Sequence, residues 1–106
     1  MASKYRNKKT GGFASKKEAR IAQELQLLEK AGEISNLRFQ VAYELLPNQR
    51  GPDGKVIERG IKYIADAVYK KDGKDVIIDI KGFRTEVYKI KKKLMLWFHK
   101  IEIQEE

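Results

Sequence analysis

Residues 61–81 read IKYIADAVYKKDGKDVIIDIK, and apolar and polar residues alternate in both halves of this stretch. Such alternation is typical of β-strands with one buried face. The dipeptide Asp72-Gly73 separates the two halves and favours a tight hairpin turn, because glycine readily adopts the positive φ that the turn requires. The stretch therefore predicts an antiparallel hairpin whose strands are 61–69 and 76–81.

The position of the turn also predicts which side chains face each other. With a two-residue loop at Asp72-Gly73, Asp66 lies directly opposite Asp79, and paired residues of this kind have Cβ atoms roughly 4.5–5.5 Å apart. Two facing carboxylates destabilise a sheet unless a cation lies between them, and oxygen ligands of this kind suit Mg²⁺ or Mn²⁺. The alternative is that both aspartates point to solvent at a sheet edge, with Lys81 as an ordinary neutralising charge.

Residues before the hairpin predict a helix, a further strand and a loop. Ser15 and Glu18 form the S-x-x-E pattern of a capping box, which marks the start of a helix that Gly32 ends. Residues 37–45 alternate as a half-buried strand does. Residues 47–60 contain the Pro, Asn, Gly and Asp that are typical of a loop, and a short strand at Val56-Ile57 stays open within it.

Residues after the hairpin predict a second helix and a last short strand. Thr85 is the expected N-cap, and the helix face expected to point inward carries Val87, Ile90, Leu94 and Trp97. Alternating isoleucines at 101 and 103 indicate the final strand. Because a strand–helix–strand connection in one sheet is parallel and right-handed, we expect this strand beside 76–81.

The expected fold is α/β, a single domain in the order α-β-β-β-α-β. Its mixed sheet has three antiparallel strands and a parallel last strand, flanked by two helices. The length of 106 residues suits one domain. We expect a basic N-terminal arm or hairpin at 1–14 and the folded domain at 15–106.

Composition excludes several classes of function. The chain has no cysteine and one histidine, which excludes disulfide frameworks, cysteine-ligated zinc and iron–sulfur clusters and makes histidine-rich sites poor candidates. No apolar run is long enough for a membrane span, so we expect a cytoplasmic protein.

The formal net charge of +8 is concentrated in two segments. Residues 1–20 and residues 81–100 each contain seven basic residues and one acidic residue, whereas the middle of the chain is acidic. This segregation indicates a polyanionic partner. The alternative is a solvated, lysine-rich surface that serves solubility.

The acidic residues and their spacing resemble the PD-(D/E)XK nuclease superfamily. Asp66, followed thirteen residues later by Asp79-Ile80-Lys81 at the end of an apolar strand, is similar to the superfamily's motif, and Glu18 matches an acidic residue that many members contribute from the first helix. The expected order of elements is that superfamily's restriction-endonuclease-like core. The sequence departs from the motif in having Ala65 in place of proline and aspartate in place of glutamate at 79.

Three segments look more narrowly like a small phage and prophage family of that superfamily, commonly described only as a domain of unknown function. These segments are Ser15–Arg20, Ile61–Asp66 and Asp79–Gly82. The resemblance implies a Mg²⁺-dependent DNA endonuclease, encoded by a phage and acting in the cytoplasm of a bacterial host cell. Because similar small members act as two-fold dimers on Holliday junctions, it also implies branched DNA as a substrate and a homodimer.

The resemblance assigns roles to individual residues. Asp66 and Asp79 would ligate Mg²⁺ or Mn²⁺ together with the carbonyl of Ile80, and Lys81 would position or help deprotonate the attacking water. Glu18 would act in catalysis and reach the metal through water. Glu18 is also the third helical residue of its capping box, so a purely structural role stays open for it.

Basic and polar residues near these motifs are the candidate nucleic-acid contacts. They are Lys16, Lys17, Arg20, Gln40, Arg84, Lys89, Lys92 and Lys93. Two other functions stay open. One is a non-catalytic basic nucleic-acid-binding module, and the other is a subunit of a larger nuclease complex that needs a protein partner.

Overall fold

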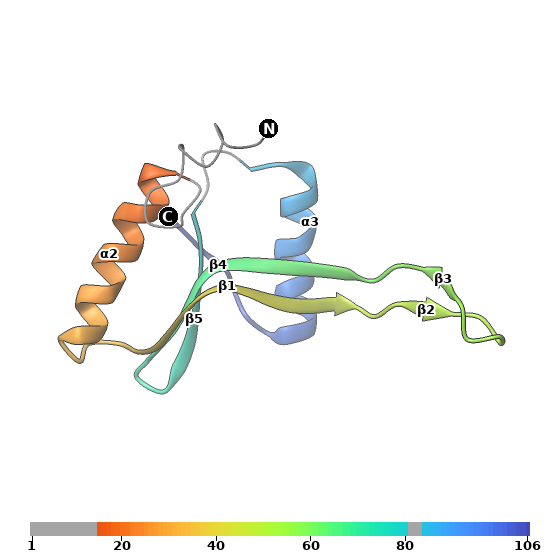
Figure 1. The fold of residues 1–106 in the computed structure, drawn as a ribbon, viewed down its shortest axis with the longest axis horizontal. Coiled ribbons are helices and arrows are strands. Elements are labelled where there is room, and N and C mark those ends of the chain that lie inside the picture. The colour runs from red at the N-terminus through yellow and green to blue at the C-terminus, as the bar shows by residue number, and fades with distance from the viewer. Residues whose placement is uncertain (1–14, 81–83) are drawn as a thin grey trace, which may run out of the picture.

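A four-stranded mixed sheet lies between two helices in the computed structural model, which describes residues 15–80 and 84–106 (Figure 1). The arm expected at 1–14 and Lys81 therefore lie outside the described residues. In chain order the elements are α2 (Lys16–Lys30), β1 (Ser35–Leu46), β2 (Gln49–Arg50), β3 (Val56–Glu58), β4 (Ile61–Lys71), β5 (Lys74–Asp79), α3 (Glu86–Leu94), the π-helical turn η1 (Met95–His99) and β6 (Gln104–Glu105).

The sheet has the strand order β1-β4-β5-β6, with β6 parallel to β5 and the other neighbours antiparallel. This confirms the expected α/β fold with a parallel last strand. The hairpin register is also confirmed, because Lys71 pairs with Lys74 and Ala67 pairs with Ile78. The final strand begins later than expected, at Gln104, because Ile103 is buried in the core before the chain joins the sheet.

Both helices begin at the expected caps. The side-chain oxygen of Ser15 accepts a hydrogen bond from the backbone N–H of Glu18 at 3.1 Å, and the hydroxyl of Thr85 accepts one from Tyr88 at 3.0 Å. Each bond satisfies a donor that the first helical turn leaves unpaired. None of the helices within 15–80 and 84–106 is long and apolar enough to cross a membrane.

Strand β4 contributes to two apolar clusters, one toward each helix. Tyr63 and Ala65 pack in the cluster that contains Tyr88 of α3, whereas Ala67 and Tyr69 pack in the cluster that contains residues of α2. All four residues have odd numbers, and alternate residues of a flat strand lie on the same face. The strand must therefore twist strongly between Ala65 and Ala67. Figure 1 shows β1 and β4 changing direction together along their length.

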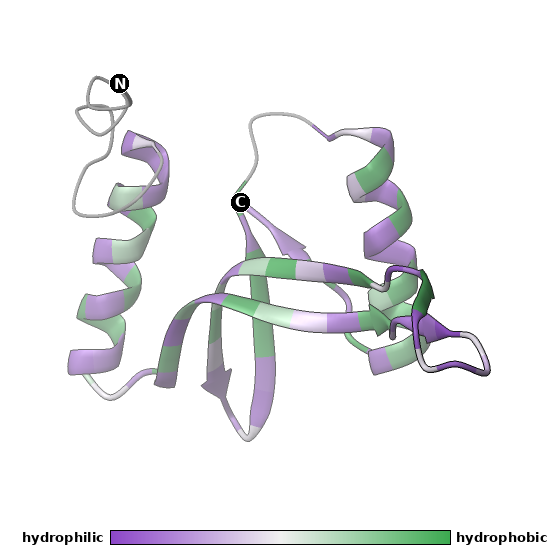
Figure 2. Ribbon diagram, turned by 45° about the vertical axis from the view of Figure 1, so that its right-hand side comes forward, coloured by the Kyte–Doolittle hydropathy of each residue, from purple (hydrophilic) through white to green (hydrophobic). Residues whose placement is uncertain are grey.

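The inward face of α3 differs from the one expected. Of the four residues expected there, Leu94 packs against the core, but the side chains of Val87, Ile90 and Trp97 are 61%, 56% and 69% exposed, and the buried residues are Tyr88 and Met95. This corresponds to a helix rotated by about one residue, or roughly 100°. The physical reason is that Tyr88 fills the core with its ring and also finds an acceptor for its hydroxyl, which valine cannot do. Apolar side chains of α3 are thus left at the surface, and Figure 2 shows hydrophobic and hydrophilic positions alternating along this helix.

The segment expected to be a loop is a second, small antiparallel sheet formed by β2 and β3. We call residues 47–60 the β2–β3 arm. At its base, the backbone N–H of Gly60 donates to the side chain of Asn48 at 2.7 Å. A Cβ atom on Gly60 would lie 2.2 Å from the carbonyl oxygen of Leu46, so the chains can approach this closely only because residue 60 is glycine.

We expect Gly60→Ala to lower the free energy of unfolding by about 1–3 kcal/mol, because the backbone around Leu46 must shift to admit the methyl group. Urea denaturation of the two proteins measures this difference. Gly51→Ala is the matched control on the same arm. Its Cβ would lie 3.1 Å from the end of the flexible Ile57 side chain, which can move aside. Equal stabilities for the two variants would contradict the prediction.

Candidate active site

Asp66 and Asp79 lie on neighbouring strands at the point where their pairing ends. The described pairs of β4 and β5 stop at Ala67 and Ile78, the pair next to the two aspartates. One carboxylate oxygen of Asp66 accepts a hydrogen bond of 2.7 Å from the backbone N–H of Ile80. The carboxylate of β4 is thereby held next to the backbone that directly follows Asp79.

Asp79 is almost completely buried, at 1% exposed, and Tyr63 is its partner. The hydroxyl of Tyr63 donates to Oδ2 of Asp79 at 2.6 Å. Burial, and then this hydrogen bond, raise the pKa of Tyr63 far above its ordinary value, so the phenol stays protonated. A buried charge is costly unless it is hydrogen-bonded, and Tyr63 provides part of that stabilisation.

Gln40, one of the predicted nucleic-acid contacts, lies beside Asp66. Its side-chain N–H donates to Asp66 in a long hydrogen bond of 3.4 Å. The backbone of Gln40 has a φ of 55°, which is uncommon for a residue other than glycine, and it occurs on β1 opposite the bend of β4. The amide side chain and the bend thus occur at one place in the sheet.

Two carboxylates and a neighbouring carbonyl are a donor set that fits Mg²⁺, which commonly takes only one or two protein carboxylates and keeps several waters. Glu18 does not complete a larger group, since within 15–80 and 84–106 no three His, Asp or Glu side chains gather closely enough to hold a metal ion. Glu18 is half-buried on α2, where its backbone N–H bonds to Ser15. Lys81 lies outside the described residues.

Tyr88 of α3 and Glu105 of β6 form a second tyrosine–carboxylate pair. The hydroxyl of Tyr88 donates to Oε2 of Glu105 at 2.7 Å. Burial and this hydrogen bond raise the pKa of Tyr88, and the same bond is the main cause of the lowered pKa of Glu105. Sequence reasoning missed both tyrosines as site residues. The available signal was that an inward tyrosine needs an acceptor for its hydroxyl.

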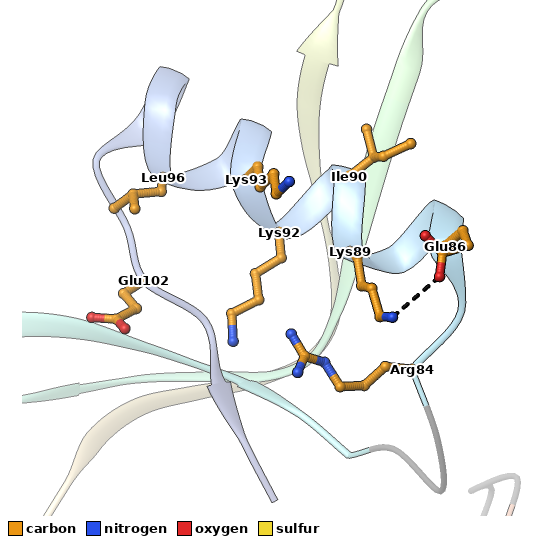
Figure 3. A pocket seen from close by; sticks show the side chains of 8 residues that line it. All are labelled: Arg84, Glu86, Lys89, Ile90, Lys92, Lys93, Leu96 and Glu102. Atoms are coloured by element: carbon orange, nitrogen blue, oxygen red, sulfur yellow. Dashed lines mark hydrogen bonds and ion pairs between the residues drawn. The ribbon is translucent and has the colours of Figure 1, made fainter.

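The predicted phosphate contacts of α3 lie together but are mostly paired with acids. Figure 3 shows Arg84, Lys89, Lys92 and Lys93 around a groove of about 350 Å³. Arg84 and Lys92 both contact Oε2 of Glu105, at 3.2 and 3.3 Å, and Lys89 contacts Glu86 at 3.1 Å. Two of these cations therefore share one carboxylate.

The predicted contacts of α2 lie on the other helix, across the sheet from α3 (Figure 1). Lys16, Lys17 and Arg20 are exposed there. Lys17 donates to the backbone oxygen of Glu106 at 3.0 Å, and Arg20 lies 3.6 Å from Glu24. Lys17 thus reaches Glu106, the residue next to the Glu105 that holds Arg84 and Lys92.

A smaller groove of about 250 Å³ adjoins the buried pair, and its lining contains two lysines that sequence reasoning missed. It lies between β4 and α3, and its lining includes Lys62, Tyr63, Tyr88 and Lys91. Within the described part of the chain, neither Lys62 nor Lys91 forms an ion pair. These two side chains are available to an anion in the groove that Tyr63, the partner of Asp79, also lines.

The raised pKa values of Tyr63 and Tyr88 predict how stability depends on alkaline pH. Because the unfolded tyrosines ionise near pH 10 and the folded ones do not, this contribution is complete below about pH 10 and is lost as the pH rises further. We expect Tyr63→Phe, and separately Tyr88→Phe, to make the slope of unfolding free energy against pH shallower by about 1.4 kcal/mol per pH unit above pH 10. Urea denaturation over that pH range measures the slope, and an unchanged slope in both variants would refute the assignment.

Comparison with known proteins identifies a family without identifying an activity. No protein with a curated description matches the chain, and no solved structure matches it. The relation to the PD-(D/E)XK superfamily therefore stays a prediction. Over residues 2–104 the chain matches the family described as "Protein of unknown function (DUF1064)", and it belongs to that family.

Proposed function

We propose that the protein is a metal-dependent endonuclease with a PD-(D/E)XK site that hydrolyses phosphodiester bonds in DNA. The observation that carries the proposal is the hydrogen bond from the Ile80 backbone to Asp66, which brings the carboxylate of β4 beside Asp79. An acid, a second acid and a lysine in this spacing, on this order of elements, are what the superfamily motif requires.

Asp66, Asp79 and the carbonyl of Ile80 would hold Mg²⁺ or Mn²⁺. When bound, the cation polarises the phosphate and eases deprotonation of a water molecule. Gln40 and the Ile80 N–H orient the carboxylate of Asp66, and Tyr63 orients that of Asp79. Lys81 follows directly on the chain, and we assign it the positioning of the attacking water and the neutralisation of charge on the phosphate.

The charge distribution supports DNA as the substrate. Lys62 and Lys91 line the groove next to Tyr63, and the groups on α2 and α3 lie on the two sides of the sheet. We further propose a homodimer acting on branched DNA such as Holliday junctions. The exposed stripe of Val87, Ile90 and Trp97 offers an apolar surface for such a contact.

One observation favours a second function, that of a non-catalytic nucleic-acid-binding module. Asp79 is 1% exposed and hydrogen-bonded to Tyr63, and within the described ranges no third acidic side chain joins the pair. A metal ion could reach Asp79 only if this environment rearranged. In the binding module, the aspartates would serve only to hold the strands together.

We expect Asp66→Asn and Asp79→Asn to lower Mg²⁺-dependent cleavage of plasmid and four-way-junction DNA by more than about 100-fold, because even outer-shell partners of a metal are worth 10–100-fold. Gel electrophoresis of the products measures cleavage. Asp75→Asn is the matched control, since Asp75 is exposed on the same strand and pairs with Lys70 at the surface. Equal cleavage by wild type and Asp79→Asn would rule out this site.

Thermal unfolding with Mn²⁺ separates the two functions. If the protein has an endonuclease site, Mn²⁺ raises the unfolding temperature of wild type but not that of Asp66→Asn, because a ligand stabilises only the state that binds it. Salt-sensitive DNA binding without any response to Mn²⁺ and without cleavage would identify the binding module instead.

Glu105→Gln is expected to strengthen DNA binding and to steepen its salt dependence. The amide keeps an acceptor for Tyr88 but removes the charge that pairs with Arg84 and Lys92. Fluorescence anisotropy with a DNA duplex, without metal, measures the affinity. Glu102→Gln removes the same charge from the lining of the groove beside Arg84 and Lys92, without breaking an ion pair in the described part of the chain. Equal effects of the two variants would contradict a specific role for Glu105.

A further inference from the structure

The β2–β3 arm projects beyond the main sheet along the longest axis of the molecule (Figure 1). From Leu46 to Arg59 every residue except Gly51 is exposed. The arm therefore contributes little to the core that holds the two helices and the main sheet together. Nothing in the proposed catalytic site uses it either.

Local hydrogen bonds hold the arm together in place of a core. An isolated two-stranded hairpin is marginally stable in water, so such bonds matter. At the tip, Arg50 donates to the carbonyl of Gly54 at 2.8 Å, and the backbone N–H of Lys55 donates to Asp53 at 2.9 Å. With the Gly60–Asn48 contact at the base, the arm has a defined direction relative to β4.

Cations of the arm lie outside the ion pairs of the described residues, as does Lys91 of α3. Lys55 and Arg59 on the arm and Lys62 just beyond it are exposed, and within the described residues none of the three forms an ion pair. One acid of the arm, Asp53, is occupied by the backbone of the turn. Arg50 and Glu58 are exposed as well, so residues 47–60 carry three basic and two acidic side chains, a net charge of +1.

Exposed apolar side chains accompany this charge. Ile57 is 66% exposed and Val56 is 41% exposed, although both lie in a strand. The side chain of Ile57 lies over Gly51 on the opposite side of the same hairpin, where a Cβ atom on residue 51 would lie 3.1 Å from Cδ1 of Ile57. A narrow ribbon with free cations and exposed aliphatic groups suits the groove of a nucleic-acid duplex, where phosphates line the rim and bases offer apolar contacts.

We propose that the β2–β3 arm lies in a groove of duplex DNA and grips it away from the reacting phosphate. The major groove is about 12 Å wide and admits a two-stranded β-ribbon. Only the position of the arm relative to the cut rests on the proposed function. Groove binding by the arm does not depend on cleavage.

The reach of the arm sets the length of DNA that it contacts. Val56 lies ten residues before Asp66 on the same run of chain, and a strand advances about 3.3 Å per residue, which gives roughly 30 Å. At about 3.4 Å per base pair this corresponds to roughly nine base pairs, close to one helical turn. The arm and the carboxylates would therefore meet the same side of the duplex one turn apart.

The test compares metal-free DNA binding by wild type and by the double variant Lys55→Gln/Arg59→Gln. Fluorescence anisotropy measures the affinity across a series of salt concentrations. We expect weaker binding to a duplex of about 30 base pairs, or three turns, and a slope of log affinity against log salt that is smaller by about 2.

Lys71→Gln/Lys74→Gln is the matched control. It removes the same charge from two exposed residues at the tip of the other hairpin, at the far end of β4. We expect it to keep the wild-type slope. Equal slopes for the arm variant and this control, or no binding of the long duplex by wild type, would overturn the proposal.

The remaining outcomes separate this proposal from neighbouring ones. Unchanged DNA binding together with a smaller sedimentation coefficient of the arm variant would overturn it in favour of a second copy of the chain as the partner. Arm-dependent DNA binding without any Asp79-dependent cleavage supports the arm and sinks only the endonuclease. Asp79-dependent cleavage without arm-dependent binding supports the endonuclease and overturns the proposal for the arm.

Discussion

The hydrogen bond between the Ile80 backbone and the Asp66 carboxylate is the contact on which the arrangement of this protein depends. Backbone pairing of β4 and β5 is described only as far as Ala67 and Ile78, and beyond it a side chain makes the connection. From there β4 continues with β1 toward the arm, while β5 leads to α3. The carboxylate of Asp66 therefore joins β4 and β5 at the point where their backbone pairing ends and the two strands diverge.

Placing acids here has an electrostatic cost, and tyrosines offset part of it. Asp79 is buried and bonded to Tyr63, and Glu105 on the adjacent parallel strand is bonded to Tyr88. Each phenol donates to a carboxylate and is itself kept protonated by burial. Tyr63 thereby stabilises Asp79 inside the fold, whereas Glu105 lies exposed at the surface, and a cation at the aspartates would offset the buried charge of Asp79 further.

Basic residues of this protein are of two kinds. Arg84 and Lys92 are held by Glu105, so an incoming phosphate must compete with a carboxylate for them. Lys55 and Lys91, by contrast, form no ion pair within the described ranges and can bind a polyanion without that competition. Helix α3 thus carries both kinds of cation, Lys92 and Lys91, and the arm adds Lys55 to the second kind.

The sequence by itself determined the features that depend on neighbours in the chain. Alternation predicted the strands, Ser15 and Thr85 predicted the helix starts, and the Asp72-Gly73 turn predicted the register that brings the two aspartates together, because each signal acts over a few residues. Only the tertiary structure decided which face of α3 is buried, which acids hold Tyr63 and Tyr88, and that residues 47–60 form a projecting arm. Those outcomes depend on contacts between residues far apart in the chain, such as Tyr88 and Glu105, and on packing that no local pattern encodes.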